Sequence, residues 1–233
     1  MSGTIIALCI ITITGGVVYF FFSKSNLKSK AKQSKQPALT LTKWDLQCMS
    51  FHEAGHAVCS YYLPEREEIL KITINPTEEA FGMIKTAVRP HHNETETSLR
   101  SLISTFLAGA LAEELFLNIR TSSGIHDFAN ARSVAIDMVA KFGMGRQTGK
   151  ITPVSVYDNS YCLFSEEFKR KVDEDTVEII KEAETTARNL LKSHANLVIN
   201  LAELLFEKQT LKKEEIVCFF NHKDRNNDEK RDF

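Results

Sequence analysis

The segment FHEAGHAV, residues 51–58, constrains this chain more than any other stretch. It contains the pattern HExxH, in which His52 and His56 are four residues apart and Glu53 directly follows the first histidine. On a helix, positions i and i+4 share a face, so both imidazoles can bind one metal ion. A catalytic zinc site has three protein ligands and an open position, and Glu53 is placed to deprotonate the attacking water. The pattern therefore predicts a zinc hydrolase, most simply a metallopeptidase.

Composition limits the alternatives but does not select a function. The 233 residues can form one domain of ordinary size with extensions. A net charge of -1 gives no indication of a nucleic-acid partner. The five cysteines are scattered and form no CxxC pair, which favours free thiols in a reducing compartment.

The N-terminal region has the character of a membrane anchor. Residues 4–22 carry no charge, and a helix of this length spans about 30 Å, the thickness of a bilayer core. We therefore expect a transmembrane anchor over residues 1–22. A cleaved signal peptide is the alternative, but no basic region precedes the apolar run and bulky aromatic residues occupy the place of a cleavage site.

A lysine-rich linker without acidic residues follows at residues 23–38. The positive-inside rule places this linker on the cytoplasmic side, or on the equivalent matrix or stromal side, of a single-pass membrane protein. We expect the rest of the chain to lie on the same side.

The folded domain is expected over residues 39–220, as a mainly α fold with a small β-sheet, before a frayed polar tail at residues 221–233. Hydrophobic periodicity and capping signals predict the elements. An exposed edge of the sheet could hydrogen-bond an extended peptide, although a purely structural sheet is the alternative. The expected helices are 41–62, 94–117, 126–143, 165–194, 197–206 and a short one from about 211, and the expected strands are 69–76 and 81–88.

The pattern HExxH needs a third protein ligand, and spacing does not identify it. No third histidine follows closely, and the segment some twenty residues downstream is predicted to be a strand. The candidates are Glu113, Glu114, His126 and Asp127. Asp127 follows a glycine turn at the start of a helix, a place where backbone geometry can orient a carboxylate.

Five ordered blocks resemble the peptidase domain of FtsH-type AAA proteases, which are membrane-bound zinc enzymes. HEAGHAV resembles the zinc helix of that family, and KITINPTEEAFGMIKT resembles the two strands after it. LAGALAEELF resembles its Ala/Gly-rich helix, and SSGIHDFANARSVAIDMVAKFGMG resembles the helix that carries its ligand aspartate. FSEEFKRKVDEDTVEIIKEA and LAELLFEKQTLKKEEI resemble its helical C-terminal part. The resemblance covers roughly residues 40–220.

The resemblance implies the assignments that spacing left open. It implies zinc ligated by His52, His56 and Asp127, with Glu53 as the catalytic base. It places Glu113 and Glu114 behind the ligands or in helix packing, where a carboxylate can orient a ligand histidine. It also implies polypeptide substrates and a ring of peptidase domains, which would be a homo-oligomer, specifically a hexamer.

One departure from the family pattern affects the expected function. Family members normally carry an ATPase module between membrane segment and peptidase, whereas only the lysine-rich linker occupies that place and no GxxxxGK[ST] motif occurs. The expectation is a membrane-anchored zinc metalloendopeptidase that cleaves unfolded or loosely folded polypeptides and does not bind ATP. The alternative is a regulatory or non-catalytic subunit that forms a mixed ring with a full-length, ATP-dependent relative.

Overall fold

The computed structural model describes residues 41–65, 67–76, 82–87, 93–154 and 164–228, with side chains up to residue 221. The predicted anchor and lysine-rich linker lie outside these ranges. Within the described ranges, no helix combines the length and the apolar character needed to cross a membrane.

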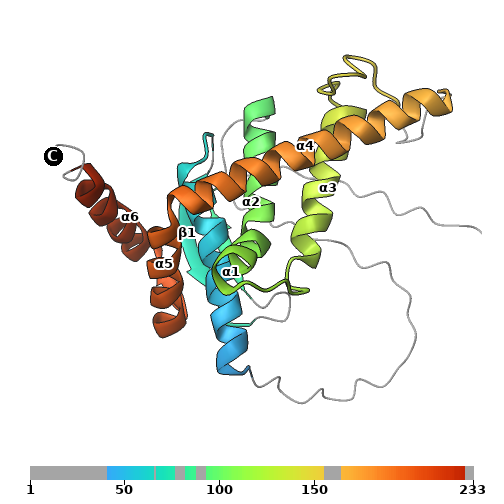
Figure 1. Cartoon of the computed structure of the whole chain (residues 1–233). Coiled ribbons are helices and arrows are strands. Elements are labelled where there is room, and N and C mark those ends of the chain that lie inside the picture. The colour runs from blue at the N-terminus through green and yellow to red at the C-terminus, as the bar shows by residue number, and fades with distance from the viewer. Residues whose placement is uncertain (1–40, 66, 77–81, 88–92, 155–163, 229–233) are drawn as a thin grey trace, which may run out of the picture. The chain divides into compact units, whose positions relative to one another are not determined.

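The described chain is mainly helical, with one small sheet, which confirms the predicted fold class (Figure 1). Its elements in order are α1 (Lys43–Tyr62), β1 (Ile69–Thr73), β2 (Met83–Thr86), α2 (Glu96–Ala112), the π-helix η1 (Glu113–Leu117), α3 (Ile125–Ala140), α4 (Glu166–Ser193), α5 (Ala195–Lys208), β3 (Thr210–Lys212) and α6 (Lys213–Asp228).

Helix α1, which carries the HExxH segment, begins and ends where the sequence signals predicted. Thr42 and Asp45 form a capping box: the Asp45 amide donates to Thr42 Oγ1 at 3.2 Å, and the Thr42 amide donates to Asp45 Oδ2 at 2.8 Å. At the other end, extended backbone at Leu63 and the following Pro64 stop the helix. The two histidines are therefore held on a helix with a fixed start and end.

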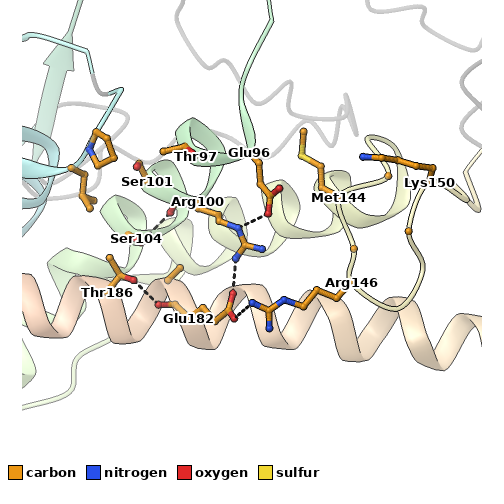
Figure 2. A pocket seen from close by; sticks show the side chains of 16 residues that line it. Glu96, Thr97, Arg100, Ser101, Ser104, Met144, Arg146, Lys150, Glu182 and Thr186 are labelled. Atoms are coloured by element: carbon orange, nitrogen blue, oxygen red, sulfur yellow. Dashed lines mark hydrogen bonds and ion pairs between the residues drawn. The ribbon is translucent and has the colours of Figure 1, made fainter.

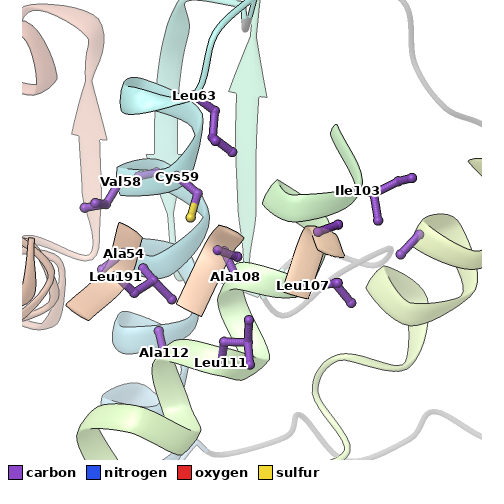
Figure 3. Close-up of a cluster of buried hydrophobic side chains, with 14 of the residues drawn as sticks. Ala54, Val58, Cys59, Leu63, Ile103, Leu107, Ala108, Leu111, Ala112 and Leu191 are labelled. Carbon is purple, nitrogen blue, oxygen red and sulfur yellow. The ribbon is translucent and has the colours of Figure 1, made fainter. Parts of the chain in front are cut away.

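Helices α1 and α2 approach each other closely through small residues. A Cβ added to Gly55 would lie only 2.5 Å from the backbone oxygen of Ala108, so the crossing has no room for a side chain there. Ala54, Ala108 and Ala112 are fully buried around it, and Leu191 of α4 belongs to the same hydrophobic core (Figure 3). This packing fixes α2 against the helix that carries the histidines.

The sheet has the strand order β2-β1-β3, and both pairings are antiparallel. Strand β3 was not predicted, because three residues are too few to show a period of two. It pairs Ile72 with Leu211, which is fully buried. Strand β1 is therefore central, and only β2 and β3 are edges of the described sheet. Helix α6 continues to Asp228, into the region expected to be a polar tail.

Candidate functional site

Helices α1 and α3 bring the three predicted metal ligands together. His52 Nε2 lies 3.1 Å from Asp127 Oδ2 and 3.0 Å from His56 Nε2, and His56 Nε2 lies 3.4 Å from Asp127 Oδ2. Asp127 belongs to the first turn of α3, after the turn that ends at Gly124. Among the described residues, His52, His56 and Asp127 are the group whose geometry could hold a metal ion.

Both imidazoles are held from the side that faces away from this point. Nδ1 of His52 bonds to Glu113 Oε1 at 2.6 Å, and Nδ1 of His56 bonds to the backbone oxygen of Thr105 at 2.7 Å. With Nδ1 donating in each ring, Nε2 is the nitrogen left to bind a metal. This arrangement fixes both the tautomer and the ring orientation.

Glu113 is almost fully buried and is itself held by two hydroxyl groups. Thr121 Oγ1 donates to Oε2 at 2.6 Å, and Ser123 Oγ donates to Oε1 at 2.5 Å. Both hydroxyls come from the segment between η1 and α3. The carboxylate contacts Nδ1 of His52 and not the metal-facing nitrogen, so its position suits orientation of the ring and not ligation.

The backbone at Glu113 departs from the continuous helix that was predicted over residues 94–117. Helix α2 ends at Ala112, and residues 113–117 form a π-helix that ends at Asn118 in the left-handed conformation. A π-helical turn of this kind frequently marks a functional site. In this chain the π-helix begins at Glu113, the residue whose carboxylate bonds to His52.

The remaining ligand candidates lie apart from the cluster. Glu114 bonds to Arg120 and Arg188, both at 3.2 Å, as a helix-packing residue would. His126 is exposed and does not belong to the metal-binding group. Of the four candidates, Asp127 is the one that groups with both histidines in a geometry that could hold a metal ion.

Burial and hydrogen bonds shift the pKa values of the cluster in opposite directions. Burial alone would lower the pKa of His52, but hydrogen bonds to Asp127 and Glu113 outweigh burial and raise that pKa to about 10. Burial opposes ionisation of Asp127 and Glu113, yet hydrogen bonds, above all from His52, hold both pKa values below the usual range. Burial raises the pKa of Glu53, against the influence of the two histidines. Glu53 therefore has more affinity for a proton than an exposed glutamate.

The donor set fits zinc in type and spacing. Zinc binds imidazole nitrogen and carboxylate oxygen at about 2.0–2.2 Å, so neighbouring donors of a tetrahedral site are separated by about 3.3 Å. The three separations of 3.0–3.4 Å agree with that value. Three protein donors also leave the fourth position that a catalytic zinc site requires.

A separate cavity of 710 Å³ lies between α2, α4 and the segment of residues 143–150 (Figure 2). On the wall of this cavity, Glu182 accepts a hydrogen bond from Arg100 at 2.6 Å and forms an ion pair with Arg146 at 2.7 Å. Neither the three candidate ligands nor Glu53 line this cavity. It is distinct from the candidate metal site.

Comparison with known proteins agrees with this geometry. The family model described as peptidase family M41 matches residues 40–218. The chain belongs to peptidase family M41. This membership confirms the resemblance to FtsH-type peptidase domains, and it indicates Zn²⁺ as the metal of the site.

The similar curated proteins are named ATP-dependent zinc metalloproteases. FtsH of Thermobaculum terrenum is 30% identical over 190 residues, which are 76% of this chain and 29% of that protein. YME1L1 of Homo sapiens is 32% identical over 170 residues, 72% of this chain and 21% of that protein. FtsH of Thermus thermophilus is 28% identical over 184 residues, 76% of this chain and 29% of that protein. The chain thus spans less than a third of the length of these relatives.

Three contributors to the site were not identified from the sequence. Thr121 and Ser123 hold Glu113, and the Thr105 carbonyl holds His56. A backbone carbonyl leaves no signal in a sequence. The two hydroxyl residues were visible only as part of a polar turn, and they bond to a carboxylate that lies eight and ten residues before them.

Proposed function

We propose that the chain hydrolyses peptide bonds at a zinc ion ligated by His52, His56 and Asp127, with Glu53 as the catalytic base. The observation that carries the proposal is the convergence of the three donor atoms at 3.0–3.4 Å from one another. Membership of a zinc metalloprotease family supports the same reaction.

Zinc, when bound, supplies a Lewis acid that activates water and stabilises developing negative charge. Glu53 takes a proton from the attacking water and delivers it to the leaving amine. Its burial suits this role, because a raised pKa makes the carboxylate a stronger base. Glu113 and the Thr105 carbonyl keep the two imidazoles in the tautomer that the reaction requires.

Strand β2 is the proposed binding edge for an extended substrate. A Cβ added to Gly82, directly before β2, would overlap Glu53 Oε1, so this strand begins beside the catalytic base. Strand β2 pairs with β1 on one side, and within the described sheet no strand covers its other side. A polypeptide that pairs there presents its backbone to the metal with little dependence on sequence. Unfolded or loosely folded polypeptides are therefore the proposed substrates.

The setting of this activity is also proposed. The uncharged run at residues 4–22 and the lysines after it support a single-pass anchor with the peptidase on the cytoplasmic, matrix or stromal side. The named relatives are ATP-dependent, whereas these 233 residues contain no phosphate-binding loop. Two assemblies are consistent with these two facts: a homo-hexameric ring, and a mixed ring with an ATPase-bearing relative.

The second candidate function is a non-catalytic subunit of such a mixed ring. The names of the relatives describe ATP-dependent proteases, and these 233 residues contain no GxxxxGK[ST] motif. Purification of the chain from its native membrane tests for such a ring, because a ring subunit co-purifies with an ATPase-bearing partner. Cleavage by the purified chain then distinguishes a catalytic from a non-catalytic subunit.

The first experiment is hydrolysis of casein by the full chain in mild detergent with zinc, beside Glu53→Gln. We expect the parent to cleave without added ATP, and the variant to bind the same amount of zinc and to cleave about 100- to 10,000-fold more slowly. Cleavage by both proteins would contradict the role of Glu53. Cleavage by neither, with zinc bound, would favour the non-catalytic subunit.

A further inference from the structure

Gly109 of α2 faces the candidate ligands directly. A Cβ built on this residue would lie 2.5 Å from His56 Nε2, 2.6 Å from His52 Nε2 and 2.7 Å from His52 Cε1. These three atoms are its nearest neighbours outside its own stretch of helix. The missing side chain of Gly109 therefore borders the same two nitrogens that face Asp127.

The space beside those nitrogens is the space that an ion requires. Zinc lies about 2.0–2.1 Å from each ligating imidazole nitrogen. A methyl group within 2.6 Å of both nitrogens would displace the rings from each other and occupy the volume between them. A hydrogen atom in that place leaves the volume free.

Other reasons for a glycine at this position do not apply. Gly109 is not among the described residues with positive φ, so the backbone does not require it. The interior of a helix disfavours glycine relative to alanine, so the residue costs stability. The tight crossing of α1 and α2 depends instead on Gly55, whose added Cβ would meet the backbone of Ala108.

We propose that Gly109 is a positioning residue of the metal centre: its lack of a side chain keeps the coordination volume open, and a side chain at residue 109 excludes the ion. The inference rests on the proposed function, because the ion in question is the one proposed at His52, His56 and Asp127. It adds a residue that binds nothing itself and yet determines whether metal binds.

The test is the zinc content of Gly109→Ala, measured on the full chain in detergent after equilibration with zinc and removal of the excess. We expect about one zinc per parent chain and almost none per variant chain. We also expect the metal-free variant to melt no lower than the metal-free parent. Alanine favours the helix, and the atoms nearest to the added Cβ belong to two side chains and not to the backbone.

Gly82→Ala is the matched control. The three nearest neighbours of its added Cβ are all atoms of the Glu53 side chain. We therefore expect this variant to retain about one zinc per chain and to lose turnover, because its clash displaces the base and not the ligands.

Each other outcome overturns the inference in a recognisable way. Zinc bound to Gly109→Ala with the affinity of the parent would show that the volume is not needed. An unfolded Gly109→Ala variant, or zinc loss in both alanine variants, would show a general disruption of the domain. A parent that binds no zinc would overturn the proposed function itself, a result distinct from failure of the inference alone.

Discussion

His52 has a carboxylate on each side of its imidazole ring, Glu113 at Nδ1 and Asp127 at Nε2. The two contacts have different consequences. Glu113 fixes the orientation of the ring through an atom that never binds metal, whereas Asp127 shares with the ring the point that a metal would occupy. The same pair of contacts raises the pKa of His52 to about 10 without metal.

The raised pKa predicts that zinc and protons compete for His52. Zinc needs the neutral imidazole, but the metal-free ring holds a proton below pH 10. Apparent zinc affinity should therefore rise with pH between about 6 and 9, and binding at neutral pH should release about one proton per zinc. Isothermal titration calorimetry in buffers of different ionisation enthalpy measures both quantities. A pH-independent affinity would contradict the assignment of His52 as a ligand.

Removal of the hydroxyls that hold Glu113 should weaken zinc binding without removing a ligand. Thr121→Ala combined with Ser123→Ala leaves the buried carboxylate free to turn away from His52. We expect zinc affinity to fall about 10- to 100-fold, as is typical for groups that orient a ligand. Competition with a chromophoric chelator measures the change. Ser122→Ala is the matched control, and an equal loss there would refute the network.

At the scale of elements, the crossing of α1 and α2 places His52, His56 and Thr105 within reach of one another. The crossing is close because Gly55 lies against the backbone of Ala108. His56 Nδ1 lies 2.7 Å from the backbone oxygen of Thr105 because α1 and α2 approach each other this closely. Element packing, and not only the motif, thus produces the geometry of the site.

Gly55→Ala should therefore destabilise the domain as a whole. The added Cβ would lie 2.5 Å from the backbone oxygen of Ala108 and 2.6 Å from Ala112 Cβ, and a backbone atom cannot rotate away. We expect the free energy of unfolding to fall by about 1–3 kcal/mol, the usual cost of overpacking. Urea unfolding of the metal-free proteins measures it. Gly109→Ala provides the contrast, because its clashes are with side chains; a loss of equal size in both variants would contradict this distinction.

At the scale of the whole described domain, the candidate ion joins two helices that are distant in sequence. Its ligands come from α1 and from the first turn of α3, and β1, β2, α2 and η1 lie between them in the sequence. An ion held only by the folded chain stabilises it by mass action.

Chelation of zinc should therefore lower the melting temperature of the full chain. With free zinc about a thousandfold above its dissociation constant, the stabilisation lost amounts to about 4 kcal/mol. Differential scanning calorimetry with and without EDTA measures it. Asp127→Ala should show a much smaller response to EDTA, and a parent that does not respond would argue against a zinc ion shared by α1 and α3.

Local features of the sequence determined the helices and the first half of the site. HExxH puts two histidines on one helix face at a spacing of four residues, and the capping box at Thr42 set the start of that helix. Periodicity predicted the long helices for the same reason, since each depends on neighbours within one or two turns. The prediction of Asp127 came from the resemblance to a family and not from spacing.

Only the tertiary structure decided which distant residues meet. The bond from His52 to Glu113 joins residues 61 positions apart, and that to Asp127 joins residues 75 apart. Strand β3 exists because β1 offers it hydrogen bonds. Glu113 bonds to His52, whereas the neighbouring Glu114 bonds to Arg120 and Arg188. Contacts of this kind depend on how helices and strands pack, and a single sequence records no such distances.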